Sequence, residues 1–560
     1  MIRKSPLTGG IAALVAVMLL CMSHISVSQP PGGTTTADAS GYVGNEACAK
    51  CHASIYESYT RTAMAKASGP ATENLIVGEL RHQPSGVNYR IYSEDAKVWL
   101  AFERPGDPSV SGKRQLLYYI GQGRRGRTYL FSVDGFVFES PVNWYADRHM
   151  WDMAPAYGGT REMPLNLPAL VSCLECHVSG IQPPIYGTEN RYNIPLFAYS
   201  GVSCERCHGP GAAHVNSGGA IVNPTKLSAV RRDAVCMQCH LEGNAAIERV
   251  GKHLYEYRPG DNLSDYVRYY ILTDSKGEGL RATSQFEALS QSVCKKKSGD
   301  AMSCTSCHDP HVQVKTEERA SFYRAKCLAC HGKPFGARHH ADRPDCTSCH
   351  MPASLSTDVA HTEVTDHRIL RRPSSTPMLE NAFAQPATPK LVPFPHSHES
   401  DSDLRDDALA WESVAESGSK LAEAEAERLL RLALLKSSDP ALLSAMGYIE
   451  QKHGDTDRAR ELYQRALALD PNLIDAATNL GVLEAKSGHM REAVTLWQGS
   501  FQRAPGRSSI GMNLARTFCG SGQFDEARTY TLRVLQFNPD LGAAKKLLNG
   551  LNADHPKCGL

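Results

Sequence analysis

Seven copies of the pattern Cys-x-x-Cys-His constrain this chain more than any other feature of its sequence. Two thiols three positions apart match the two vinyl groups of one haem, and the adjacent histidine can then bind the iron from the proximal side. We therefore expect seven covalent c-type haems. The attachment pairs are Cys48/Cys51, Cys173/Cys176, Cys204/Cys207, Cys236/Cys239, Cys304/Cys307, Cys327/Cys330 and Cys346/Cys349, and the proximal ligands are His52, His177, His208, His240, His308, His331 and His350.

Zinc sites and thioredoxin-like redox pairs also use Cys-x-x-Cys. Neither requires histidine at the next position, and every Cys-x-x-Cys of this chain has it. Disulfides closed within such short spacings would also be a poor framework for an exported protein of 560 residues. Haem attachment is the interpretation that accounts for the histidines.

Four cysteines lie outside the motifs. Cys21 falls in the apolar run near the start of the chain. Cys519 and Cys558 both lie near the C-terminus and can form a disulfide in an oxidising compartment. Cys294 has two interpretations, a buried thiol or a sulfur close to a haem.

The first residues indicate export. Arg3 and Lys4 precede a short apolar run over residues 11–21, and small residues follow around Ser26, so we predict a signal peptide over residues 1–28. The run is too short for a membrane span, and no later segment has the roughly 20 apolar residues that a span needs. We expect a periplasmic or otherwise exported protein without an integral membrane segment in the mature chain.

Electron-carrying haems usually have ligands on both faces of the iron, whereas catalytic haems leave one face open. Nine histidines of the haem region could serve the seven irons, so complete bis-histidine ligation is possible but not required. Thioether ligation by Met64 would raise the potential of the first haem, and an ordinary apolar contact is the alternative. The distal candidates are His214 and His311, closest after motifs, then His361 and His367, then His82, His149, His253, one of the pair His339 and His340, and Met64.

The first motif stands apart from the other six. The interval before Cys173 is rich in β-branched and aromatic residues broken by turns such as Asp134-Gly135, which predicts a β-rich insertion over about residues 84–142. A cluster of Arg124, Arg125 and Arg127 there suits a solvated hairpin tip; contact with an anionic partner or with haem propionates is the alternative. From Cys173 to His350 the motifs crowd together, so porphyrin faces must supply much of the core.

The last part of the chain is helical and repetitive. Residues 373–403 are rich in proline and predict an extended linker. Beyond them Pro471, Pro505 and Pro539 recur every 34 residues, which is typical of tetratricopeptide repeats. We predict a repeat domain over residues 404–553 that binds a protein or peptide, or else acts as a spacer or self-association surface.

Residues 42–372 resemble a superfamily that includes the pentahaem nitrite reductases, the octahaem hydroxylamine oxidoreductases and a tetrahaem cytochrome that accepts electrons from the latter. The similar features are Tyr42-Val43-Gly44, Cys204-Glu-Arg-Cys-His-Gly-Pro-Gly with His214, Cys304-Thr-Ser-Cys-His-Asp-Pro-His and Cys346-Thr-Ser-Cys-His-Met-Pro. Two departures stand out. The lysine-ligated motif Cys-x-x-Cys-Lys of the nitrite reductases is absent from the sequence, and Met64 stands where the tetrahaem relatives often have histidine.

These features predict a mostly α protein, in which a seven-haem cytochrome domain with little regular structure and a β-rich insertion precedes an α-solenoid of repeats. We expect periplasmic electron transfer with redox partner proteins. The alternative is an oxidoreductase that acts on a small nitrogen or sulfur oxyanion at one open haem, near Met64, Cys294 or the arginine cluster; the sequence leaves open whether the chain is an enzyme. A redox sensor is a third reading. The net charge of +1 gives no sign of a nucleic-acid partner.

Overall fold

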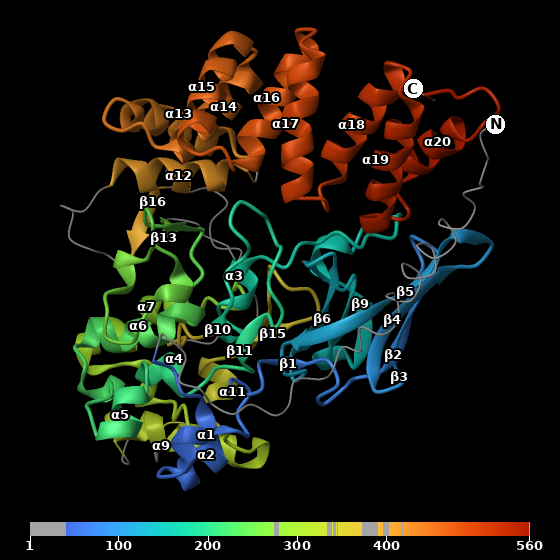
Figure 1. Cartoon of the computed structure of the whole chain (residues 1–560). Coiled ribbons are helices and arrows are strands. Elements are labelled where there is room, and N and C mark those ends of the chain that lie inside the picture. Colours follow the sequence, from blue (N-terminus) through green and yellow to red (C-terminus); the bar gives the residue numbers. More distant parts are fainter. Residues whose placement is uncertain are drawn as a thin grey trace, which may run out of the picture.

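The computed structural model describes residues 41–273, 279–332, 339, 343, 345–371, 390–395, 403–416 and 418–558. The predicted signal peptide lies outside these residues. Figure 1 shows short helices and loops at the lower left, a β sheet at the right, and a row of paired helices above both. None of the described helices has the length and apolar character to cross a membrane.

A nine-stranded antiparallel sheet fills the interval between the first two motifs. Its main path runs β2-β3-β4-β5-β6-β8-β9, with β1 paired to β5 and β7 paired to β6. The strands are β1 Ser68–Pro70, β2 Gly78–His82, β3 Val87–Glu94, β4 Lys97–Arg104, β5 Asp107–Ile120, β6 Gly126–Val133, β7 Phe136–Glu139, β8 Val142–Tyr145 and β9 Met150–Met153. The sheet extends beyond the predicted insertion at both of its ends in the sequence. Its outer strands were not predicted because they carry mixed polar residues and show little alternation.

The alternating apolar residues of β3 and β4 form the buried face of this sheet. Val98, Leu100 and Phe102 are at most 3% exposed, as are their counterparts on β3. Asp134 and Gly135 both have positive φ and make the tight turn between β6 and β7. The sequence pattern therefore predicted the central hairpins correctly.

The arginine cluster is not a solvated tip throughout. Arg127 is 3% exposed, its guanidinium lies 4.1 Å from the ring centroid of Tyr119, and it donates hydrogen bonds to the carbonyls of Gly121 and Gln122. Burial of this charge inside the sheet gives Arg127 a structural role.

The haem region has little regular structure, as expected. Its helices are α1 Asn45–Ala49, α2 Ala53–Tyr59, α3 Val171–Leu174, α4 Glu205–His208, α5 Ala212–Ser217, α6 Ala229–His240, α7 Gln285–Gln291, α8 Val293–Ser298, α9 Arg319–His331 and α11 Thr347–His350. Its small sheets pair β10 Ser179–Ile181 with β11 Phe197–Tyr199, and β14 Ala353–Leu355 with β15 Glu363–Thr365. Among the helices of this region that the structure describes, only α6 and α9 are longer than two turns.

A third small sheet joins the haem region to the predicted linker. Its order is β12-β13-β16, where β12 is Ala245–Glu248, β13 is Val267–Thr273 and β16 is Lys390–Phe394. Residues 390–394 thus form a strand inside the range predicted as an extended linker. Most of that range, including residues 373–389, lies outside the described residues.

Paired helices build the C-terminal region. They are α12 Leu404–Ala415, α13 Lys420–Leu434, α14 Pro440–His453, α15 Thr456–Leu469, α16 Ile474–Lys486, α17 Met490–Arg503, α18 Ser508–Gly520, α19 Phe524–Phe537 and α20 Gly542–Leu551. A Cβ on Gly447 would lie 2.8 Å from the ring of Tyr463, and one on Gly481 would lie 2.5 Å from that of Trp497. The 34-residue recurrence of glycine therefore allows the two helices of a repeat to pack closely.

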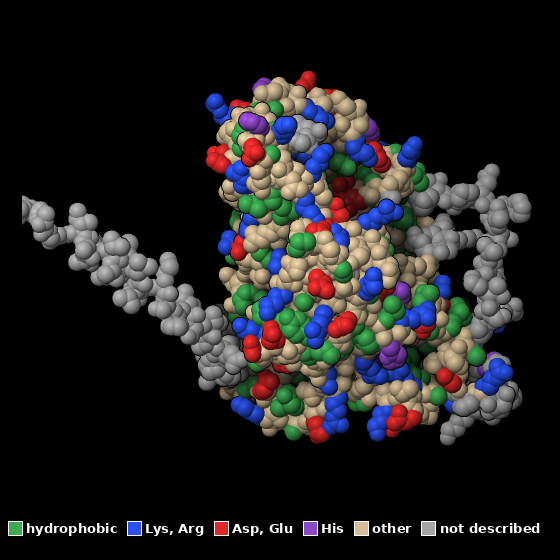
Figure 2. Space-filling view, turned by 90° about the vertical axis from the view of Figure 1, so that its right-hand side faces the viewer, with side chains coloured by type: hydrophobic (Ala, Val, Ile, Leu, Met, Phe, Trp, Pro, Cys, Tyr) green, Lys and Arg blue, Asp and Glu red, His purple; other side chains and the backbone are tan. Residues whose placement is uncertain are grey.

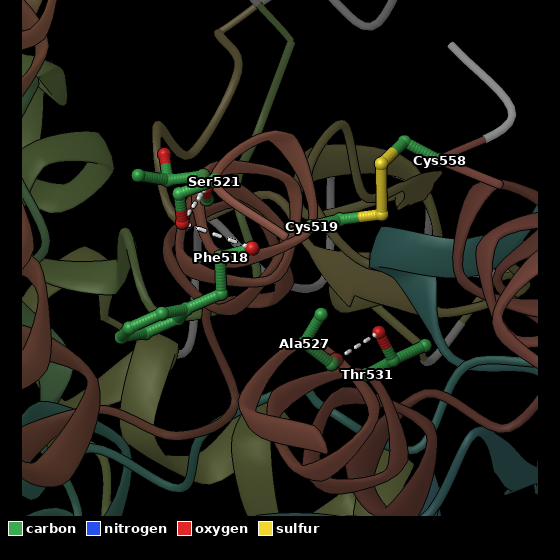
Figure 3. The surroundings of a disulfide bond; sticks show 7 residues. Phe518, Cys519, Ser521, Ala527, Thr531 and Cys558 are labelled. Carbon is green, nitrogen blue, oxygen red and sulfur yellow. Dashed lines mark hydrogen bonds between the residues drawn. A yellow bond between two sulfur atoms is a disulfide. The ribbon is translucent and has the colours of Figure 1, made fainter. Parts of the chain in front are cut away.

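A disulfide between Cys519 and Cys558 joins α18 to the end of the chain (Figure 3). Cys519 is 2% exposed within the core of the last repeats. The pairing that the sequence allowed is therefore present, and it holds the segment after α20 against α18.

The repeats lie across both other parts of the chain (Figure 1). At one end, Asp407 of α12 accepts a hydrogen bond from Tyr270 of β13 at 2.8 Å. At the other end, the fully buried ring of Phe537 belongs to the core of the nine-stranded sheet, 5.4 Å from Phe138. The sheet and the repeats thus share one core, which fixes the repeats relative to the haem region.

Charged side chains of both signs are interspersed over the face of the molecule that Figure 2 shows. This distribution agrees with the net charge of +1. The expectation of mostly α structure holds only roughly, because a large strand-rich region accompanies the helical repeats.

Candidate functional site

Each haem-attachment motif occupies about one turn of helix or 3-10 helix. The amide of the motif histidine donates to the carbonyl of the first cysteine at His52 (2.9 Å), His208 (3.0 Å), His308 (2.9 Å) and His350 (3.0 Å). Such an i to i−4 bond places the two cysteines and the histidine on one side of the turn. The fourth and sixth motifs end the two long helices, α6 and α9.

The motifs touch one another through their cysteines. Thiols of different motifs lie close enough to shift one another's pKa: Cys48 and Cys204, Cys176 and Cys239, Cys236 and Cys304, and Cys327 and Cys346. These contacts pair the first motif with the third, the second with the fourth, the fourth with the fifth, and the sixth with the seventh.

Three attachment cysteines are exposed: Cys51, Cys173 and Cys330. Their partners within the motif, Cys48, Cys176 and Cys327, are half-buried, as is Cys349. Burial therefore differs between the two cysteines of a single motif.

Helix geometry explains why one cysteine of a motif can face solvent when the other does not. Three residues along a helical turn rotate a side chain by about 60° from the first, which is enough at the edge of the region. Cys349 Sγ accepts a long hydrogen bond, 3.9 Å, from Ser348 of its own motif, and Cys330 is close enough to Cys307 to influence that thiol. Thioether formation at the motif cysteines, exposed or half-buried, stays a prediction.

Four of the motif histidines face a second histidine. The ring centroids are 6.5 Å apart for His52 and His214, 6.1 Å for His208 and His311, 6.2 Å for His308 and His367, and 6.0 Å for His350 and His339. The angles between ring planes are 14°, 15°, 29° and 35° in the same order. In each pair one partner belongs to a motif and the other is a distal candidate.

This spacing fits an iron bound from both faces. A metal–imidazole bond is about 2.0–2.1 Å long and the ring centre lies roughly 1 Å beyond the nitrogen, so two opposed imidazoles on one metal have centroids about 6 Å apart. The residues therefore fit a c-type haem in donor type, number and separation. When bound, haem would supply a one-electron iron couple.

Hydrogen bonds at Nδ1 leave Nε2 available for metal in several of these rings. The Nδ1 atoms of His208, His214, His350 and His367 lie 2.8, 2.9, 2.6 and 2.9 Å from backbone carbonyl oxygens. A carbonyl can only accept, so Nδ1 must carry the proton and Nε2 the lone pair. Metal-ligating histidines are held in this way in other proteins.

Burial lowers the pKa of three motif histidines and so favours the neutral imidazole, which is the form that binds metal. It lowers the pKa of His208, with a smaller contribution from neighbouring histidines. Burial and the nearby His367 and His240 lower the pKa of His308 to about 4. The pKa of His177 is lowered by burial as well.

The other distal candidates have different neighbours. His82 Nδ1 lies 2.8 Å from Ser85 Oγ, and the exposed His253 has Nδ1 2.8 Å from Glu248 Oε2. His361 Nε2 lies 2.7 Å from Asp152 Oδ2 of the sheet. The exposed His149 packs edge-on against Trp144, and His340 lies outside the described residues.

Met64 belongs to a segment near the second motif as well as the first. Its carbonyl accepts a hydrogen bond from Val202 at 2.9 Å, and nearby Ser68 donates to the carbonyl of His177 at 2.8 Å. Cys294 lies close enough to Cys307 and Cys327 to influence both thiols. The sulfur of Cys294 is thus close to two attachment sites.

Two residues outside the candidate set contribute to the site. Glu205, 1% exposed, accepts hydrogen bonds from the amides of Val43 (2.9 Å), Gly44 (2.9 Å) and Gly211 (2.8 Å). Its carboxylate ties the segment before the first motif to the third motif. The sequence could have indicated this role of Glu205 only through the presence of both segments that it joins, Tyr-Val-Gly and Cys-Glu-Arg-Cys-His-Gly-Pro-Gly.

The second residue outside the candidate set is Gln285, whose Oε1 lies 3.0 Å from His240 Nδ1. Nothing in its sequence context marked it.

Comparisons with known protein families match two parts of the chain. Residues 153–209, which contain the second and third motifs, match the family described as cytochrome c554 and c-prime. Residues 440–473 match the tetratricopeptide repeat family. A multihaem cytochrome region joined to repeats is supported by these two matches and by the relative described next.

One curated relative is similar, the multiheme cytochrome MtrA of Shewanella baltica (strain OS185). It is 24% identical over 190 residues, which is 30% of this chain and 54% of that protein. The chain thus spans about half the length of the curated relative that it matches.

Several solved structures are similar to about a quarter of the chain. They include MamA (19% identity, 24% of this chain and 90% of that chain, TM-score 0.20) and MamA from Desulfovibrio magneticus RS-1 (20% identity, 27% and 85%, TM-score 0.24). YrrB, a tetratricopeptide protein with an unusual peptide-binding site, is 20% identical over 25% of this chain and 81% of that chain, with a TM-score of 0.21.

Proposed function

We propose that this protein relays electrons between partner proteins in the periplasm through seven covalent haems. The observation that carries the proposal is the set of four opposed histidine pairs, because two imidazoles on one iron are typical of electron carriers. The match to a cytochrome family over the second and third motifs supports it. The polypeptide would set the spacing and ligation of the haems, and iron would carry the electron.

The proposed axial ligands are interlaced along the chain. His214, which follows the third motif, binds the first haem, and His311, which follows the fifth motif, binds the third. His367 follows the last motif and binds the fifth haem. His339 and His350 bind the seventh haem. The pairs leave the distal ligands of the second, fourth and sixth haems to the other candidates, which include His82, His149, His253, His361 and Met64.

From the contacts between cysteines of different motifs we propose an order of electron transfer. The first haem lies next to the third and the second next to the fourth, through Cys48–Cys204 and Cys176–Cys239. Electrostatic proximity of Cys207 to Cys239 links the third motif to the fourth. The path continues from the fourth to the fifth, and Cys294 lies between the fifth and sixth. The fourth motif is therefore the branch point of the array.

We also propose that the repeats bind a protein or peptide partner close to this array. Repeats of this type present surfaces for protein binding, and here they are fixed against the haem region through Phe537 and Asp407. A partner held by the repeats would thus keep one orientation relative to the haems.

Haem content and spin state of the purified protein test the proposal. A pyridine haemochrome assay should give seven haems per chain, and electron paramagnetic resonance should be dominated by low-spin ferric iron. Mass spectrometry of proteolytic peptides should find haem on the motifs of the exposed Cys51, Cys173 and Cys330 as well. A substantial high-spin signal from the native protein would instead favour an oxidoreductase with an open haem, and turnover assays with nitrite, hydroxylamine, tetrathionate and sulfite would then follow.

A single substitution tests the ligand assignment. His214→Ala should convert one haem of the seven to high spin, because His214 faces only His52 at ligand spacing. The matched control is His253→Ala, since His253 is exposed and contacts Glu248 and Tyr255. An unchanged spectrum for His214→Ala, or equal effects of both substitutions, would refute the assignment.

A further inference from the structure

The motif histidines differ in what holds Nδ1. Backbone carbonyls hold His208 and His350, so no substitution can remove those acceptors. The side chain of Gln285 faces His240 instead, with 3.0 Å between Gln285 Oε1 and His240 Nδ1. The fourth motif is therefore a site where one substitution can change the hydrogen bond to a proximal ligand.

The orientation of the Gln285 amide is fixed by a second contact. Gln285 Nε2 donates to the carbonyl oxygen of Ala282 at 2.7 Å, so Oε1 is the atom that faces the histidine. An amide oxygen accepts only. Nδ1 of His240 must then carry the proton, which leaves the lone pair on Nε2.

The helix that carries Gln285 is itself fastened to the end of α6. Glu287, two residues further along α7, accepts hydrogen bonds from the amides of Glu242 (3.0 Å) and Gly243 (2.7 Å), shortly after His240. Thr283 donates to Glu242 Oε2 at 2.7 Å. The distance between Gln285 and His240 is thus set by several contacts on both sides of the pair.

We propose that Gln285 is a positioning residue that sets the reduction potential of the haem at the fourth motif. The inference rests on the proposed function, which makes His240 an iron ligand. A stronger acceptor at Nδ1 gives the imidazole more anionic character, which makes it a better donor to iron and stabilises the ferric state. Because the fourth motif contacts both the second and the fifth through its cysteines, this potential governs how electrons divide at the branch point.

Two substitutions at Gln285 should move the potential in opposite directions. Gln285→Glu keeps the shape and adds negative charge to the acceptor, so one of the seven one-electron waves should shift to lower potential. Gln285→Leu removes the acceptor, so the same wave should shift upwards. We expect about a tenfold change in the ferric/ferrous equilibrium in each case, or about 59 mV for a one-electron couple.

The measurement is a spectroelectrochemical titration of the holoprotein, with dithionite as reductant and ferricyanide as oxidant. The control is Gln291→Glu, which adds the same charge at the exposed far end of α7 and should leave all seven waves in place. Shifts of the same sign for Glu and Leu at position 285, or a Gln291→Glu shift equal to that of Gln285→Glu, would overturn the proposal. Opposite signs cannot arise from a merely structural role, which both substitutions would disturb alike.

Haem content separates this inference from the proposed function. Mass spectrometry of the proteolytic peptide around Cys236 and Cys239 shows whether the fourth motif carries haem. A motif without haem refutes the proposed function. A haem-bearing motif with seven unshifted waves in both Gln285 variants refutes only the role of Gln285.

Discussion

Substituting Phe537 tests whether the repeats and the nine-stranded sheet form one cooperative unit. Phe537 ends helix α19, yet its side chain is fully buried in the core of the sheet, 5.4 Å from Phe138. Arg533 lies over its ring at 4.7 Å. Phe537→Ala therefore creates a cavity at the interface rather than within the repeats.

The expected cost follows from that burial. Truncating a fully buried phenylalanine to alanine destabilises a protein by about 3–5 kcal/mol. That cost includes the loss of the aromatic pair with Phe138 and of the Arg533 contact. Since the cavity borders both parts, the free energy of opening should fall by a similar amount in helix α19 and in strand β7.

Hydrogen exchange of the holoprotein, measured segment by segment, resolves the two parts. The control is Leu532→Ala on the same helix, because Leu532 is 50% exposed and its truncation should change stability by only about 0.5 kcal/mol. If α19 loosens while exchange in β7 is unchanged, the repeats are not coupled to the sheet. If both variants behave alike, the shared core does not exist.

Three further predictions concern the repeats. Replacing Cys519 and Cys558 by serine opens a loop with a sequence separation of 39 and should lower the free energy of unfolding of the repeats by about 3–4 kcal/mol, measured by urea denaturation. Burial and two nearby carboxylates raise the pKa of Glu412 to about 7 from its ordinary 4.5; the folded state then holds a proton that the unfolded state has lost, so stability relative to Glu412→Gln should fall as pH rises from 4.5 to about 7. Gly481→Ala should destabilise by about 1–3 kcal/mol, since the new Cβ would lie 2.5 Å from Trp497, despite alanine's helix preference of about 1 kcal/mol.

A different experimental result would contradict each of these three predictions. Gly520→Ala is the control for Gly481, because no atom lies within 4 Å of its added Cβ; equal effects at the two glycines would refute the packing argument. A stability difference between wild type and Glu412→Gln that stays constant across the pH window would show that the carboxyl group is not perturbed. Serine variants that unfold at the wild-type urea concentration would show that the disulfide contributes nothing.

The haem motifs and the repeats could be predicted from the sequence because both depend on fixed local spacing. Thioether attachment requires two cysteines three positions apart, and repeat packing requires a small residue such as Gly447 opposite a ring such as Tyr463. The hairpins around Asp134 followed from alternation and turn residues. In each case the residues that determine the structure lie within a few turns or one repeat of one another.

The distal pairs could not be predicted, because they depend on contacts between distant segments. His214 and His311 stood out because they closely follow motifs, but that proximity does not determine which iron they bind. Each instead faces the histidine of a different motif. Likewise Arg127 looked like part of an exposed tip, and its burial follows from contacts with Tyr119 and two carbonyls that no local pattern encodes.

The exposure of individual motif cysteines could not be predicted from the sequence for the same reason. The spacing of Cys48 and Cys51 is identical to that of Cys236 and Cys239, yet Cys51 is exposed and Cys239 contacts Cys176 of another motif. Which thiol meets a neighbouring motif depends on how the short helical turns are oriented. That orientation is set by distant contacts such as those of Glu205.

Interlaced ligation explains how a region with so little regular structure can hold a fixed shape. On the proposed assignment, the first, third and fifth haems each join their own motif to a segment that follows a later motif, through His214, His311 and His367. Each iron would then close a long loop, and closing long loops removes conformational entropy from the unfolded chain. The cofactors would thus supply the long-range connections of the haem region. In the repeats, neighbouring helices supply the connections, and a distal histidine substitution should therefore loosen the haem region while leaving the exchange of helices α14 to α17 unchanged.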